Sequence, residues 1–66
     1  MDEEAIEVLI RDYGVSEASA RRGLSEFKNQ KGIHESEDLA ERYDAEIDTI
    51  TEEIYWTILP AVGFHN

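Results

Sequence analysis

In the second half of the chain, apolar residues recur at steps of three and four. They are Leu39, Tyr43, Ile47, Ile50, Ile54 and Ile58. This spacing puts their side chains on one face of an α-helix, whereas no stretch of the chain alternates with the period of two that a half-buried strand requires. Ser36 is placed to cap this helix and Pro60 to end it. The spacing therefore predicts one long helix over residues 37–59 and an all-α fold.

Two shorter helices are predicted before it, over residues 3–13 and 17–28. Acidic residues follow Asp2, where the helix dipole favours them, and Gly14 stands where a left-handed residue ends a helix. Ser16 is a favoured cap for the second helix. The apolar residues of these helices that are expected to join the core are Ile6, Leu9, Ile10, Ala20, Leu24 and Phe27. We expect them to pack against the apolar face of the long helix.

The 66 residues form a single predicted domain, since a chain of this size buries only about 60 % of its surface on folding. There is no cysteine, which excludes disulfides and thiolate metal sites. Residues 28–32 are polar and end in glycine, as is typical of a linker. We expect a small three-helix bundle over residues 1–66, made of two short helices and one long acidic helix, with an apolar C-terminal tail after Pro60.

The charge of the chain is strongly negative, with sixteen acidic and six basic residues and a formal net charge of −10. This balance argues against direct binding to nucleic acid, because affinity for phosphates comes from clustered Lys and Arg. An anionic membrane surface is disfavoured for the same reason. The N-terminus lacks the basic start of a signal peptide, and the longest weakly polar stretch, residues 54–64, is shorter than the roughly 20 residues of a membrane span. We therefore expect a cytoplasmic protein.

Five carboxylates of the predicted long helix follow one another at steps of four, three, four and four. They are Glu37, Glu41, Asp44, Asp48 and Glu52. On one continuous helix they form a stripe roughly 22 Å long, with spacings close to those of phosphates along a nucleic-acid strand. Most of them lack a basic residue four positions on. Either this stripe is a solvated face that confers solubility, or it contacts a basic surface on a partner protein.

A second irregularity is aromatic. Tyr55, Trp56 and Leu59 point away from the apolar face of the predicted long helix. One explanation is that the tail, residues 61–64, folds back over them. The other is that Tyr55 and Trp56 contact a partner or a second copy of the chain, giving a homodimer through these residues and the tail, since aromatic residues dominate interface energetics.

No arrangement of residues predicts catalysis or a cofactor. No serine lies beside a histidine in a recognisable nucleophile motif, and His34 and His65 belong to no zinc-ligand pattern. Residues 44–48 alternate like the start of a calcium loop, but the sixth position is Thr49 and the twelfth is Tyr55, where such a loop needs Gly and Glu. We expect a protein with no enzymatic activity, no metal and no cofactor.

The segment from Tyr13 to Leu24 resembles the turn and second helix of a helix-turn-helix, because a Gly-Val-Ser turn precedes Ala20, Gly23 and Leu24. That resemblance implies a helix in the DNA major groove. Only two basic residues lie in the segment, and the net charge of the whole chain would repel a duplex.

The same residues also resemble a ubiquitin-associated domain, in which a Gly-apolar-Ser loop precedes Ala and then a small-Leu pair at the spacing of Gly14, Ala20, Gly23 and Leu24. This resemblance implies a three-helix protein-binding module whose contact loop holds Tyr13, Gly14 and Val15. The simpler alternative is that two short helices need small residues where they cross. The match ends at residues 28–35, where the second loop is too long.

In size, charge and helical architecture the chain resembles the phage-encoded inhibitors of bacterial defence, namely anti-CRISPR proteins and DNA mimics. The resemblance implies an acidic binding protein that inhibits a nucleic-acid-binding host protein by occupying its basic surface, in the cytoplasm of the host if the chain is phage-encoded. The partner-binding residues would be the acidic stripe together with Tyr55 and Trp56. The alternatives are a ubiquitin-associated-type module and a helical subunit of a larger assembly.

Overall fold

Every regular element of the computed structural model, which describes residues 2–43 and 45–62, is helical, so the all-α prediction is confirmed. The helices are α1 (Asp2–Tyr13), α2 (Glu17–Gln30), α3 (Leu39–Arg42), α4 (Ile47–Glu53) and α5 (Leu59–Ala61), with a π-helical segment η1 (Ile54–Ile58) between the last two. The first two helices match the predicted ones to within about two residues at their ends. The predicted third helix does not form as one piece.

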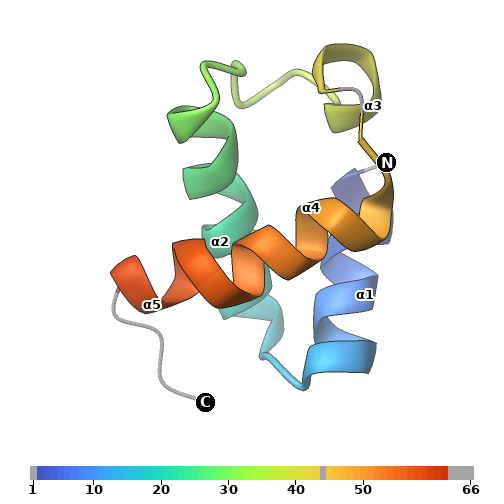
Figure 1. Cartoon of the computed structure of the whole chain (residues 1–66), viewed down its shortest axis with the longest axis vertical. Helices are drawn as coiled ribbons and strands as arrows, with labels where there is room; N and C mark the ends of the chain where they lie inside the picture. The colour runs from blue at the N-terminus through green and yellow to red at the C-terminus, as the bar shows by residue number, and fades with distance from the viewer. Residues whose placement is uncertain (1, 44, 63–66) are drawn as a thin grey trace.

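Helices α1 and α2 run in opposite directions, and α4, η1 and α5 form one rod that crosses them (Figure 1). Along this rod α4 packs against α1 and η1 packs against α2. The short helix α3 lies beside the N-terminal end of α1 (Figure 1), where the Asp2 carboxylate accepts a hydrogen bond from the Leu39 N–H at 3.1 Å. Helices α1, α2 and α3 and the rod of α4, η1 and α5 thus share one core, and they do not form a regular bundle of parallel or antiparallel helices.

The turn between α1 and α2 forms as its residues predict. Gly14 has φ 71°, the left-handed conformation that glycine adopts without steric penalty. The Ser16 hydroxyl accepts a hydrogen bond from the Ser19 N–H at 3.1 Å and so caps α2. For α3 the predicted cap is wrong, because Asp38 and not Ser36 accepts the capping bond, from the Ala40 N–H at 2.8 Å.

The core contains most of the residues predicted for it. Its buried members are Ala5, Ile6, Leu9, Val15, Ala20, Leu24, Phe27, Ile33, Leu39, Ile50, Ile54, Ile58 and Leu59. Tyr43 and Ile47 are partly buried against this core. Ile10 was expected in it and is 40 % exposed instead. Successive residues of a helix point about 100° apart, and because α1 turns Leu9 fully inward, Ile10 lies at the edge of the covered face.

The prediction of one long helix over residues 37–59 is wrong, because the chain leaves the helical conformation between α3 and α4. Tyr43 (φ −132°, ψ 110°) and Glu46 (φ −67°, ψ 149°) are extended, and Asp44 lies outside the described residues. A continuous helix would be about 35 Å long, which exceeds the 29 Å extent of the folded chain. Its carboxylates, three and four residues apart, would also repel one another.

Breaking the helix lets both of its halves reach the core. Leu39 on α3 and Ile50 on α4 are 0 % and 2 % exposed. Between them the Tyr43 ring packs edge-on against Phe27, with ring centroids 5.2 Å apart and planes at 83°. Lys31 Nζ lies 5.6 Å from the Tyr43 ring centroid. The same apolar residues that predicted one helical face are therefore buried from two different directions.

The π-helical segment η1 explains why the predicted orientation of Leu59 is wrong. Leu59 was expected to point away from the core and is 1 % exposed. Its N–H donates to the carbonyl of Ile54, five residues earlier, and this wider turn brings Ile54, Ile58 and Leu59 to one side of the rod. Gly23 makes room for them, since a Cβ there would lie 2.7 Å from a Leu59 methyl and 2.8 Å from an Ile54 methyl. The glycine thus serves the contact between α2 and η1.

Lys28 joins the parts of the fold that are far apart in sequence. The sequence placed it in a polar linker, whereas in the structure it lies in α2 and is 2 % exposed. Its Nζ donates to the Asp2 carboxylate at 2.5 Å, to the Glu35 carbonyl oxygen at 3.1 Å and to the Glu37 carbonyl oxygen. The start of α1, the end of α2 and the loop leading to α3 are therefore held by one ammonium group.

Replacing Ile50 with Ala is expected to lower the free energy of unfolding by about 2–5 kcal/mol, because the side chain is fully enclosed and its removal leaves a cavity. Ile10→Ala is the matched control and is expected to lower it by less than about 1 kcal/mol, since that side chain lies at the surface. Urea unfolding followed by circular dichroism measures both. Equal losses would contradict the packing of α4 described above.

Replacing Lys28 with Met is expected to destabilise the protein by about 3 kcal/mol, because it leaves the Asp2 carboxylate and two backbone carbonyls without their donor. The loss lies toward the lower end of the range for buried pairs, since the Asp2 side chain is 30 % exposed and can be hydrated. Lys31→Met, which removes the more exposed pair with Glu53, is expected to cause a distinctly smaller loss. The same unfolding experiment compares the two. A Lys28 variant as stable as the parent chain would show that the ammonium group does not hold the fold together.

Candidate functional site

The five carboxylates predicted to form a stripe do not share a helix. Glu37 lies in the loop before α3, Glu41 lies on α3, Asp44 lies outside the described residues, and Asp48 and Glu52 lie one turn apart on α4. The continuous 22 Å stripe is therefore a wrong prediction, because the chain changes direction between Tyr43 and Glu46. Glu41, Asp48 and Glu52 are exposed.

Glu37 is held within the protein. One of its carboxylate oxygens lies 3.3 Å from Arg42 Nε, and the other accepts a hydrogen bond from the His34 N–H at 2.8 Å. Its backbone carbonyl also accepts from Lys28. Glu37 therefore stabilises the loop before α3 and is less available to a partner than the other predicted carboxylates.

Most of the basic side chains are also engaged. The ion pairs join Arg11 to Glu7 and Asp12, Arg21 to Glu3 and Glu17, Lys28 to Asp2, Lys31 to Glu53, and Arg42 to Glu37. Hydrogen bonds to Glu3 and then Glu17 raise the pKa of Arg21, and the hydrogen bond to Glu53 raises the pKa of Lys31. These bases are thus neutralised by acids beside them and do not offset the remaining negative charge.

Most of the described carboxylates without an ion pair lie on α3, on or just before α4, and on the first turn of α1, whereas Glu26 and Glu35 lie elsewhere and accept hydrogen bonds from Gln30 and Ser25. Within residues 2–43 and 45–62, Glu4, Glu41, Glu46 and Glu52 make no ion pair. Asp48 has only a longer-range interaction, with Arg11. We call these five exposed carboxylates, Glu4, Glu41, Glu46, Asp48 and Glu52, the acidic surface. It replaces the stripe that the sequence predicted and shares three residues with it.

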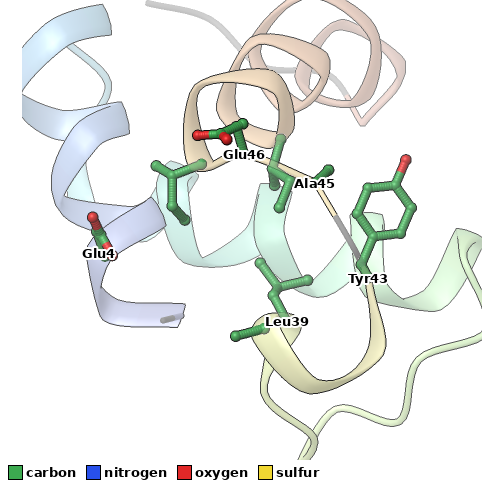
Figure 2. A pocket seen from close by; sticks show the side chains of 8 residues that line it. Glu4, Leu39, Tyr43, Ala45 and Glu46 are labelled. Atoms are coloured by element: carbon green, nitrogen blue, oxygen red, sulfur yellow. The ribbon is translucent and has the colours of Figure 1, made fainter.

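A pocket of about 470 Å³ opens where α1, α3 and the start of α4 come together, and two residues of the acidic surface line it. Its lining residues are Glu4, Leu39, Ala40, Tyr43, Ala45, Glu46, Ile47 and Ile50. Figure 2 shows Glu4 and Tyr43 on opposite sides of the pocket, with Leu39 on a third side and Ala45 and Glu46 facing it. The pocket exists because the helical conformation is interrupted between α3 and α4, so that these two helices diverge from each other.

The walls of the pocket differ in chemistry. Leu39 and Ile50 are fully buried and, with Ala45 and Ile47, make an apolar lining. Glu4 and Glu46 are exposed and supply two carboxylates from different elements. Such a pocket suits a ligand with an apolar stem and a positive end. Sequence reasoning missed that Glu4 and Glu46 line one pocket, since no local pattern connects residues 42 positions apart.

The predicted aromatic residues lie on another part of the surface, where Tyr13, Tyr55 and Trp56 form what we call the aromatic patch. The Tyr13 and Tyr55 ring centroids are 4.8 Å apart, and the Tyr55 and Trp56 centroids are 5.0 Å apart with planes at 87°. Tyr55 is half-buried, whereas Trp56 is 68 % exposed. Of the tail segment expected to cover them, residues 61–64, the last two lie outside the described residues.

The loop implied by the ubiquitin-associated resemblance does not present all three of its residues. Val15 is 3 % exposed and belongs to the core. Tyr13 is half-buried against Tyr55, and Gly14 is exposed. A partner at this loop would therefore meet little of the apolar contact that the resemblance implies.

The described residues contain no candidate metal site and no candidate membrane-spanning helix. No group of three or more His, Asp or Glu side chains there is arranged to hold a metal ion. His34 Nδ1 lies 2.7 Å from the Ser36 hydroxyl oxygen and accepts from the Ser36 N–H at 3.1 Å, which fixes the loop locally. None of the described helices combines the length and the apolar character that crossing a bilayer requires.

Comparison of the chain with protein-family models, with curated proteins and with solved structures finds no match. The helix-turn-helix, ubiquitin-associated and phage-inhibitor resemblances stay predictions.

Proposed function

We propose that this protein is a non-enzymatic acidic binding protein that acts in the cytoplasm by occupying the basic, nucleic-acid-binding surface of a partner protein. In this respect it resembles inhibitors of the anti-CRISPR and DNA-mimic type. The contact is made by the acidic surface, with Glu41, Asp48 and Glu52 retained from the sequence prediction and Glu4 and Glu46 added by the fold.

The observation that carries this proposal is the uneven pairing of charge. The ion pairs of Arg11, Arg21, Lys28, Lys31 and Arg42 take up other carboxylates, while the five carboxylates of the acidic surface are exposed and make no ion pair within the described residues. Unpaired like charges destabilise a compact chain by repulsion. A basic partner surface would remove that repulsion on binding.

The mechanism is competition for one surface. Carboxylates of the acidic surface would take the places of phosphates beside Lys and Arg side chains of the partner, so that nucleic acid and this protein exclude each other. The net charge of −10 would attract such a partner over distance and raise the association rate. A standard interface takes about 800 Å² from each protein, roughly a fifth of the 4161 Å² surface of this chain. The acidic surface and its surroundings would supply that area.

Reversing two charges of the acidic surface, Glu41→Lys with Asp48→Lys, is expected to slow association with the partner about tenfold or more at low salt. The effect should shrink as salt rises, because exposed charges are screened over about 10 Å at 0.1 M. The partner is recovered by affinity capture with the parent chain from a host lysate, and its binding rates are then measured by surface plasmon resonance.

The matched control is Glu7→Lys with Glu17→Lys, which makes the same change in net charge at carboxylates already paired with Arg11 and Arg21. It is expected to reduce the rate much less. Competition with DNA or RNA supplies a second measure, since nucleic acid should displace the protein from its partner. A ternary complex that keeps nucleic acid in its usual channel, or equal losses in both double variants, would contradict the proposal.

A second candidate function, a helical subunit that assembles through the aromatic patch, is favoured by the 68 % exposure of Trp56. Tryptophan is enriched at the centres of protein interfaces, and an exposed tryptophan whose neighbour Tyr55 packs against Tyr13 is suited to binding another protein surface. In this alternative the occupant is a second copy of the chain, and the homodimer forms through Tyr55, Trp56 and the C-terminal tail.

Replacing Trp56 with Glu is expected to convert such a homodimer into a monomer, which sedimentation equilibrium measures directly. Self-association of the parent chain should strengthen with salt, because two chains of charge −10 repel each other. Thr57→Glu, on the adjacent exposed position, carries the same charge change and serves as the control. A parent chain that stays monomeric at all salt concentrations would remove this alternative.

A further inference from the structure

The pocket between α1, α3 and α4 has a shape and chemistry that the acidic surface alone does not require. It encloses about 470 Å³, which lies within the range of pockets that hold small ligands. Leu39, Ala45 and Ile50 contribute apolar lining, and the exposed residues Glu4 and Glu46 contribute two carboxylates; Figure 2 shows how Leu39, Ala45 and the two glutamates lie around it. A surface that only kept the protein soluble would not need apolar side chains and carboxylates around one pocket.

We infer that the pocket receives one arginine side chain of the basic partner, so that a single anchoring residue fixes how the two proteins dock. This inference rests on the proposed function and adds to it the residue type that is recognised. By that proposal the partner surface is rich in Lys and Arg, so it can supply the arginine that the pocket would bind.

Complementarity of charge and shape selects a basic side chain. The aliphatic stem of such a residue would cover the apolar lining, and its positive end would lie between two carboxylates. Neither Glu4 nor Glu46 makes an ion pair with another described residue, so both can accept hydrogen bonds from the ligand. An apolar or acidic side chain would leave these carboxylates unpaired or repelled.

Arginine fits better than lysine for two reasons. Its planar guanidinium presents several N–H donors in a fixed fork, which can serve two carboxylates that come from different elements. The ring of Tyr43 forms one side of the pocket, and guanidinium groups stack on aromatic faces more readily than ammonium groups. Lysine is a compact point charge and would use one carboxylate at a time.

The direct test is a titration of the ¹⁵N-labelled protein with N-acetyl-arginine methylamide, followed by NMR. We expect a dissociation constant in the roughly millimolar range, as suits a ligand of this size, with shifts confined to the pocket residues and their neighbours. The capped citrulline analogue has the same shape without the charge and should cause no such shifts. The capped lysine should bind more weakly. Shifts spread over the whole acidic surface, or equal binding of all three probes, would overturn the inference.

Two variants that leave the net charge unchanged distinguish binding in the pocket from attraction by the negative charge of the whole chain. Ala45→Leu fills the pocket without altering the net charge, and it is expected to abolish binding of the capped arginine and to raise the dissociation rate of the partner at least tenfold. Ala18→Leu, at an exposed position of α2 far from the pocket lining, should alter neither.

A second matched pair decides the question even if the Ala45 variant does not fold. Glu46→Gln and Glu52→Gln each remove one negative charge from the acidic surface, but only Glu46 lines the pocket. Loss of arginine binding in Glu46→Gln alone supports the inference. If Glu41→Lys with Asp48→Lys weakens partner binding while the pocket variants bind normally, the proposed function stands and the arginine pocket is refuted. If the capped arginine binds and no basic partner does, the proposed function is refuted instead.

Discussion

The buried ammonium group of Lys28 is the interaction on which the rest of the fold depends. Its three donors reach the Asp2 carboxylate and the carbonyl oxygens of Glu35 and Glu37, so that the start of α1, the end of α2 and the following loop are fixed together. The second oxygen of Asp2 then holds the first N–H of α3. An unsatisfied charge at a site that is 2 % exposed would be costly, and the fold provides a partner for each of its protons. A short chain without disulfides gains in this way a connection between segments that its small core alone would hold less firmly.

The position of α3 that this interaction sets has a direct consequence for the surface. With α3 held beside the start of α1, the chain must turn between Tyr43 and Glu46 before α4 can cross the α1–α2 pair (Figure 1). That turn divides the acidic segment between two helices and opens the pocket between them. The described carboxylates that a straight helix would have set in one row lie instead on separate elements, and the pocket is lined by two others, Glu4 and Glu46. The linear stripe therefore does not form, and the pocket instead brings together carboxylates from α1 and from the residue before α4.

The proposed function rests on the carboxylates that the ion pairs leave exposed. Most basic side chains on α1 and α2 are matched by nearby acids, as Arg21 is by Glu3 and Glu17, and unpaired carboxylates lie near α3 and α4. The aromatic patch lies apart from this region, on residues of α1 and η1. The π-helical turn is part of the reason, because it turns Ile54, Ile58 and Leu59 inward while Trp56 remains 68 % exposed. One small chain thus carries two surfaces of different chemistry, one suited to a salt-sensitive partner and one to apolar contact.

The sequence by itself determined the helical class, the ends of the first two helices and most of the core, because periodicity, the Ser16 cap and the left-handed Gly14 are local features that act over a few residues. Leu24, Phe27 and Ile50 could be assigned to the core from spacing alone. Only the tertiary structure decided the burial of Lys28, the break of the long helix, the inward turn of Leu59 and the presence of Glu4 and Glu46 in one pocket. Each of these depends on contacts between residues distant in the chain, where the energy of packing outweighs the local helical preference. The acidic composition predicted a charged surface, but its shape was set by the place where the core required the helix to end.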